Sequence, residues 1–136
     1  MAKVFKGKIA IPGDKIDEFF KAMEQAEKEK QPFKDSLVKL NEEFENYLAK
    51  KYTKATVRKH STVVDLFIHF ICRHTDVKKL EEVTRGMVNS EFRTWWKRKV
   101  WDSTSDNQIK IALKKFFNFL AEEKNIVNEK VLKALK

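Results

Sequence analysis

The sequence predicts an all-α protein of one helical domain. Only three Gly and two Pro interrupt 136 residues rich in Lys, Glu, Leu, Ala and Phe, a composition that favours helices over a turn-rich β design. Apolar residues recur at spacings of three and four in several segments, which is the period of a helix with one buried face. A chain of this length buries roughly two thirds of the surface that its unfolded form exposes. It is therefore expected to fold around one core.

The most apolar predicted helix runs from Thr53 to His74 and organises the rest. Its second half is apolar on nearly every side, so other elements must enclose it. The apolar residues there are Leu66, Phe67, Ile68, Phe70, Ile71 and Cys72. Four polar residues at the other end recur at spacings of three and four, which places them on one helix face: Lys51, Lys54, Arg58 and Thr62. This helix is predicted to fill the core and to present a basic edge.

The N-terminal 35 residues are predicted to be an extension with one peripheral helix. Residues 1–13 end in Pro-Gly and form either an arm or a short strand. Asp14 is a candidate N-cap, and the helix is expected to end before Pro32. Its apolar residues are Ile16, Phe19, Phe20 and Met23. Residues 36–136 then form the main domain, and its first helix is expected from Asp35 or Ser36 to about Lys50.

Two further helices are predicted before the C-terminus. Thr84 can cap the first of them, in which Arg93 and Lys97 share one side. Its inward-facing residues are Val88, Phe92, Trp95 and Trp96. The second begins with Ser105 and Gln108, three residues apart as in a capping box, and ends near residue 125. Residues 127–136 are predicted to add one short terminal helix.

The net charge of +9 is concentrated in the middle of the chain. Residues 1–50 hold ten basic and ten acidic side chains, whereas residues 51–120 hold fifteen and seven. A basic patch confined to one part of a domain attracts polyanions. The last long helix contributes a second polar face, which comprises Ser103, Asn107, Lys110 and Lys114. Both polar faces lie at helix starts, where free N–H groups and the helix dipole also favour phosphate.

These two faces predict binding to double-stranded DNA. Lys and Arg would supply affinity for phosphates, while Asn107, Gln108 and Arg58 are residue types that read base edges in the major groove. The alternative interpretation is a helical protein–protein interaction domain with a solvated basic surface. In that case Trp101 and the terminal helix would dock the partner. The two hypotheses differ in whether charge reversal on the basic faces weakens binding.

Other functional classes find little support in the sequence. His69, Cys72 and His74 match no zinc-ligand spacing, and neither a nucleophilic triad nor a Gly-rich phosphate loop occurs. We therefore expect no catalytic residue, metal, cofactor or small-molecule substrate. Nowhere do about 18 apolar residues follow one another, and the N-terminus lacks the apolar run of a signal peptide. A single cysteine cannot form an internal disulfide, so we expect an intracellular, cytoplasmic protein without membrane partners.

The order of these segments resembles a known family. Residues 44–71 (FENYLAKKYTKATVRKHSTVVDLFIHFI), 80–96 (LEEVTRGMVNSEFRTWW) and 103–135 (STSDNQIKIALKKFFNFLAEEKNIVNEKVLKAL) are similar to the core-binding, SAM-like N-terminal domain of tyrosine recombinases, the phage integrase family. The matching landmarks are Tyr47-Leu48, Thr56, Val83-Thr84, Ala112-Leu113, Phe116-Phe117 and Phe119-Leu120. The likeness covers about residues 36–135.

The resemblance implies a four-helix bundle that forms half of a clamp around duplex DNA, with the extra N-terminal helix and the short C-terminal helix added here. By position it implies one DNA contact set of Lys54, Thr56, Arg58 and Lys59, and another of Ser105, Asn107, Gln108 and Lys110. A recombinase catalytic domain and other protomers of a synaptic complex would be further partners.

Two departures from the family pattern bear on function. The chain has no His-x-x-Arg and no tyrosine in a suitable place for a nucleophile, so we expect it to be unable to cut DNA by itself. The family often has Asn-Pro after its last bundle helix, whereas Asn128 is followed here by Glu129.

Overall fold

The computed structural model describes residues 13–100 and 104–135, and over these ranges the protein is all-α, as predicted. A short 3-10 turn, η1 (Gly13–Lys15), leads into α1 (Ile16–Ala49), and α2 (Lys54–His74) follows. A second 3-10 turn, η2 (Leu80–Glu82), and a π-helical turn, η3 (Met87–Glu91), precede α3 (Phe92–Lys99). The last elements are α4 (Asp106–Glu123) and α5 (Glu129–Ala134). None of the helices in the described ranges is both long and apolar enough to cross a membrane.

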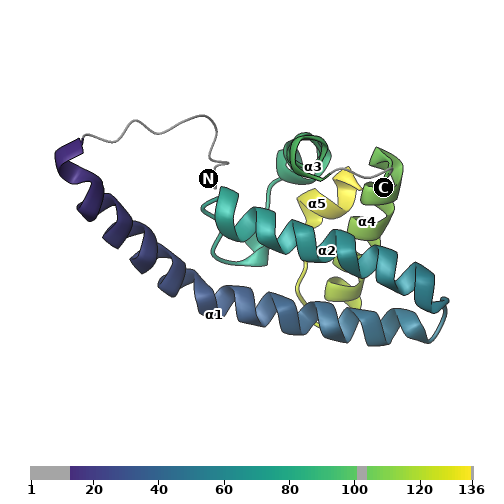
Figure 1. Ribbon diagram of the computed structural model, residues 1–136. Helices are drawn as coiled ribbons and strands as arrows, with labels where there is room; N and C mark the ends of the chain where they lie inside the picture. Colours follow the sequence, from purple (N-terminus) through teal and green to yellow (C-terminus); the bar gives the residue numbers. More distant parts are fainter. Residues whose placement is uncertain (1–12, 101–103, 136) are drawn as a thin grey trace.

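Helix α2 lies at the centre of the bundle. Figure 1 shows α2 passing in front of α4, with α1 along one side and α3 on the other. Seven of its residues are buried: Ser61, Val63, Val64, Phe67, Ile68, Phe70 and Ile71. Phe67 contacts the rings of Phe92 in α3 and Phe117 in α4, at centroid distances of 5.2 and 6.0 Å. The prediction that this helix fills the core is confirmed.

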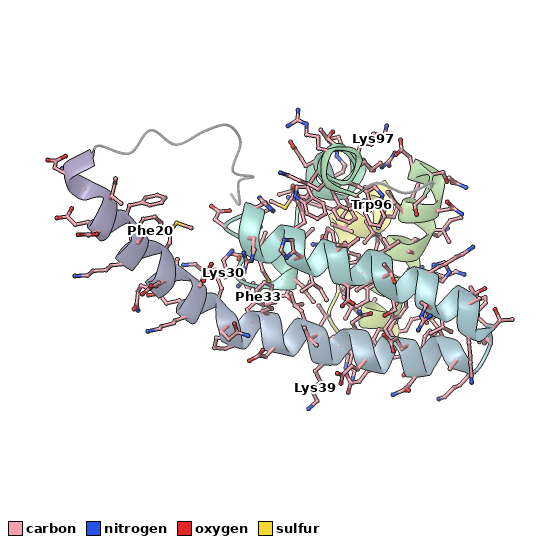
Figure 2. All side chains as sticks on the ribbon, in the orientation of Figure 1. Phe20, Lys30, Phe33, Lys39, Trp96 and Lys97 are labelled. Carbon is pink, nitrogen blue, oxygen red and sulfur yellow. The ribbon has the colours of Figure 1, made fainter. Side chains whose placement is uncertain are left out.

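The predicted break before residue 35 is wrong, because α1 continues through Pro32 as one helix. Proline removes one helical hydrogen bond and clashes with the preceding turn, which usually ends or kinks a helix. Here the helix changes direction near Lys30 and Phe33 instead of ending (Figure 2). The Lys30 ammonium donates to Thr75 O at 2.6 Å, at the C-terminal end of α2, where carbonyls favour a cation. Phe33 packs against the core.

The first half of α1 extends away from the bundle (Figure 1). None of the residues 13–29 is buried, and the predicted apolar stripe there is largely exposed. Ile16, Phe20 and Met23 are 42, 55 and 45% accessible. The helix in this segment is therefore stabilised by the helix propensity of its residues and by its continuity with the packed half of α1.

Three of the predicted helix caps are confirmed, whereas the predicted Asp14 cap is wrong, because α1 follows Lys15 without a side-chain cap hydrogen bond. Thr53 Oγ1 accepts a hydrogen bond from Thr56 N, and Thr84 Oγ1 accepts one from Met87 N. At the start of α4, Gln108 N donates to Ser105 Oγ while Ser105 N donates to Gln108 Oε1, which makes the reciprocal capping box. Asn125, at φ 55°, takes the left-handed conformation that follows the end of α4.

The region between α2 and α4 differs from the expected single helix. Helical structure begins at residue 85, widens into the π-helical turn η3, and returns to α-helical geometry in α3. Val88, Phe92 and Trp96 are buried as predicted, whereas Trp95 is only half-buried. Residues 1–12 and Trp101 lie outside the described ranges, so the predicted arm or strand and the predicted partner contact have no structural counterpart to compare.

Candidate nucleic-acid interface

The first predicted polar face lies along the outer side of α2. Lys54, Arg58 and Thr62 are exposed on one face of the helix, and Lys51 is exposed just before it. The ion pairs among the described residues involve neither Lys54 nor Arg58. Their charges are therefore available to an external anion. Lys59 is also exposed.

Thr56 has a local role at the start of the same helix. Its side chain is half-buried, and its hydroxyl oxygen accepts from Thr53 Oγ1 at 3.1 Å. The N-cap and the predicted contact residue thus share one hydrogen-bonded cluster at the first turn of α2. This fixes the direction in which the helix start and its free N–H groups point.

A groove of about 540 Å³ separates this face from the end of α1. Its α1 wall contains Glu45, and its α2 wall contains Lys54, Arg58 and Asp65. The two carboxylates are held by neutral donors: Ser61 Oγ donates to Glu45, and Asn41 Nδ2 donates to Asp65 Oδ1 at 3.0 Å. Acidic groups therefore flank the basic face on the side toward α1, where none was predicted from the sequence.

The second predicted face lies at the start of α4. Asn107 and Lys114 are exposed, and Lys110 is half-buried. Ser105 and Gln108 use one side-chain oxygen each in the capping box, which leaves the Gln108 amide nitrogen as a free donor group. Ser103 lies outside the described residues. The predicted side chains of Asn107, Gln108 and Lys114 at this face are thus exposed and can contact a ligand through a free donor group.

A contact that was not predicted from the sequence joins α4 to the start of α2. Lys115 Nζ in α4 lies 4.0 Å from the ring centroid of Tyr52, immediately before α2, and 3.4 Å from His60 Nε2. Burial lowers the pKa of His60, and the nearby Lys115 charge lowers it further. The start of α2 is thereby tied to the middle of α4. In Figure 1 the N-terminal ends of both helices lie at the same end of the bundle, on the right of the view.

The cations of α3 differ from one another in pairing and exposure. Lys97 forms an ion pair with Asp106, the first residue of α4, at 3.4 Å. Arg93 is half-buried, and its Nε has no hydrogen-bond partner among the described residues. Arg98 and Lys99, which the sequence analysis did not select, are exposed in the last turn. The run Lys-Arg-Lys at 97–99 was the sequence signal that could have found them.

The structure offers no metal centre within residues 13–100 and 104–135, where no three His, Cys, Asp or Glu side chains converge. Cys72 is half-buried, and burial raises the pKa of its thiol. A protonated, half-buried thiol is a poor nucleophile and a poor metal ligand. The chemistry available on this surface is thus the binding of anions and of hydrogen-bonding groups.

Comparison with known protein families gives a match over most of the described domain. Residues 42–124 match the family model described as the N-terminal SAM-like domain of phage integrase. The matched segment contains α2, α3 and α4 together with the end of α1, and therefore both polar faces. No curated protein and no solved structure matched the chain.

Proposed function

Because the chain belongs to the family of phage integrase N-terminal SAM-like domains, we propose that it binds duplex DNA through the two polar faces at the starts of α2 and α4. The observation that carries the proposal is the Tyr52–Lys115–His60 contact, which ties the start of α2 to the middle of α4. Two polar faces on helices that are linked in this way suit two successive stretches of DNA backbone beside one groove.

The proposed roles differ between the faces. Lys54, Arg58 and Lys114 are exposed cations that would neutralise phosphates and set the salt dependence. Asn107 and Gln108 carry amide groups that could meet base edges, with Gln108 held in place by its capping bond to Ser105. Lys97 is engaged by Asp106, so it would contribute less than its exposed neighbours.

Strand cleavage is outside this proposal, because the matched family domain is not itself catalytic. We propose that an integrase catalytic domain closes the other side of the DNA, and that other protomers assemble on the same DNA. Such a complex would place the protein with DNA in the cytoplasm.

The rival protein–protein hypothesis has partial support. The exposed apolar residues of the first half of α1 could serve a protein partner. The terminal helix, however, turns Val131 into the core, and Leu135 beside it is also fully buried, so its apolar face is already covered. The predicted docking role of α5 is thereby weakened, while the basic faces still require an explanation.

The test is titration of a labelled duplex by fluorescence anisotropy at several salt concentrations. We expect log K to fall with log salt at a slope of about −0.9 per neutralised phosphate. Arg58→Glu and Lys114→Glu, both on exposed side chains, should each weaken binding at every DNA sequence and make the slope shallower by about 0.9 or more.

Lys39→Glu is the matched control. Lys39 is exposed on α1 and points away from α2 and α4 (Figure 2), so the same charge reversal should change affinity far less. Equal affinities for the wild type and both interface variants would overturn the proposal. Equal losses in all three variants would show a non-specific charge effect and overturn the assignment of the faces.

A further inference from the structure

A second groove, of about 460 Å³, lies between the second half of α2 and α3, outside the proposed contact set. Its walls comprise Leu66, His69, His74, Trp95, Lys99 and Val100, with Asp65 at one edge. The Trp95 ring centroid lies 5.8 Å from that of His69 and 5.7 Å from that of His74. The two imidazole rings are 6.0 Å apart. Two titratable rings and one lysine thus line a single concave surface.

The groove continues the polar face of α2. Arg58, Thr62, Asp65 and His69 follow one another at spacings of four, three and four, so they share one side of the helix. From Arg58 to His69 the helix rises about 16 Å. A DNA strand that contacts Arg58 and runs along this face would cover that distance within a few nucleotides.

The charges around the groove are mostly positive. Burial is the main cause that lowers the pKa of His69, and the charges of Arg73, His74 and Lys34 lower it further. Burial likewise lowers the pKa of His74, followed by the charges of Lys99 and Arg73. The carboxylate at the edge, Asp65, accepts a hydrogen bond from Asn41 of α1. The groove therefore combines a permanent cation with two imidazoles that would gain from a nearby anion.

The ring arrangement argues against a stacked base as the ligand. Phe92 stacks on Trp95 at an interplanar angle of 17°, and the two histidine rings lie against Trp95 as well. The Phe70 ring centroid also lies 5.8 Å from that of Trp95, so the indole is already in contact with four rings. A compact anion that reaches the imidazole nitrogens and the Lys99 ammonium fits the donor set better than a flat apolar ring does.

We propose that this groove is an additional binding site for a DNA backbone phosphate, held by Lys99 and by His69 and His74 in their protonated forms. The inference rests on the proposed function and extends its contact surface from the start of α2 to its C-terminal half. Leu66, Val100 and Trp95 form the apolar part of the wall beside these charged groups.

Binding at this site takes up protons. In the free protein both imidazoles are held below their usual pKa, so they are largely neutral at pH 7 to 8. A phosphate raises both pKa values, because an opposite charge favours the protonated form. DNA affinity therefore rises as the pH is lowered from 8 to 6, by at most about tenfold per pH unit for each proton taken up. Arg73, Lys34 and Lys99 oppose this uptake, and Asp65 supports it.

The experiment measures the affinity for one duplex at pH 6 and pH 8 and constant ionic strength. The wild type should bind several-fold more tightly at pH 6, and the double variant His69→Gln/His74→Gln should lose most of that difference. Lys99→Gln should weaken binding at both pH values and make the salt slope shallower by about 0.9. Lys39→Gln is the control, because Lys39 is exposed on α1 and does not line the groove.

A second measurement follows the imidazole resonances of His69 and His74 by NMR. Their pKa values should rise when duplex DNA is added. His60→Gln separates this site from the contact with Lys115, since His60 is also held at a low pKa. If His60→Gln abolishes the pH effect and the double variant keeps it, the groove is not the source and the inference is overturned.

The outcomes separate the two proposals. A wild type that binds DNA, with Arg58→Glu impaired but the groove variants unchanged, would overturn this inference alone. A wild type that binds no duplex at either pH would overturn the proposed function and this inference with it.

Discussion

Replacing Asn128 by alanine should strongly destabilise the fold, because this side chain joins three segments. It is only 7% accessible. Its Oδ1 accepts from Val131 N at the start of α5, and its Nδ2 donates to Leu80 O and Val83 O at 3.1 and 2.8 Å. The family resemblance singles out this asparagine, which often precedes proline, and the structure shows a role for it as an N-cap and as a clamp on η2.

The expected loss follows from these three bonds. Removing an N-cap costs about 1 kcal/mol, and each hydrogen bond from the amide to a buried carbonyl contributes about 1 kcal/mol net. Leu80 O also accepts from Val83 N, so it keeps one partner. Asn128→Ala should therefore lower the free energy of unfolding by about 2 to 4 kcal/mol.

Urea denaturation followed by circular dichroism at 222 nm measures this loss, with an unchanged m-value as the sign that the folded state persists. Asn128→Ser keeps an oxygen for the cap and should lose less than the alanine variant. Asn128→Asp keeps the cap but places an acceptor-only carboxylate against two carbonyl oxygens, so it should lose at least as much as alanine at neutral pH. A loss below about 1 kcal/mol for Asn128→Ala would refute the reasoning.

Three other perturbations test the packing and the electrostatics of the fold. Phe44→Ala removes a fully buried ring and should cost about 3 to 5 kcal/mol in urea denaturation, whereas Phe20→Ala on the exposed half of α1 should change stability by less than about 0.5 kcal/mol. Lys30→Met deletes the contact with the C-terminal carbonyls of α2 and should lower the melting temperature, while Lys28→Met on the exposed surface should leave it unchanged. The free energy of unfolding should fall as the pH is lowered from 7.5 to 5.5, because the unfolded chain binds protons at histidine more tightly than the folded chain does. The variant His60→Gln should show a smaller dependence of the unfolding free energy on pH. A free energy of unfolding that rises as the pH is lowered would contradict the lowered pKa of His60.

The parts of the fold that follow local rules were predictable. Thr53 and the Ser105–Gln108 pair are caps whose spacing is legible in the sequence, and they begin α2 and α4 as expected. The burial of the second half of α2 could be predicted, because its apolar residues leave no polar stripe that could face solvent. The resemblance to the integrase domain came from the same segments and is confirmed by the family match.

The errors arise where a distant segment decides the local outcome. Pro32 normally ends a helix, yet α1 continues because the turns on both sides find partners, Lys30 at the end of α2 and Phe33 on the core. No rule based on neighbouring residues contains that information. Arg93 was grouped with Lys97 by spacing alone, but the packing of α3 half-buries the first and pairs the second with Asp106.

In the candidate site, too, the features that depend on one helix could be predicted, and those that depend on the packing of helices could not. Spacing placed Lys54 and Arg58 on one exposed face, which depends only on the geometry of a single helix. The link from Lys115 to Tyr52 and His60 depends on how α4 crosses α2, and the sequence does not specify that crossing. The groove around His69 and Trp95 likewise needs the docking of α3.

The carboxylates beside the basic face restrict the side from which a DNA phosphate can approach Arg58. Glu45 and Asp65 line the groove on the α1 side of Arg58 and accept hydrogen bonds from Ser61 and Asn41, and neither forms an ion pair with Lys54 or Arg58 within the described residues. A phosphate in the groove beside α1 would meet both carboxylates and be repelled, whereas one on the α4 side of Arg58 would meet Lys115 and the start of α4, and one at His69 and His74 would meet Asp65 alone. The carboxylates of Glu45 and Asp65, held by Ser61 and Asn41, thus favour the α4 side of Arg58 as the path of a DNA strand across α2. Asp65→Asn should therefore widen the range of DNA sequences and forms that bind, in addition to raising affinity, and a gain in affinity with unchanged selectivity between duplex and single-stranded DNA would argue against such a directing role.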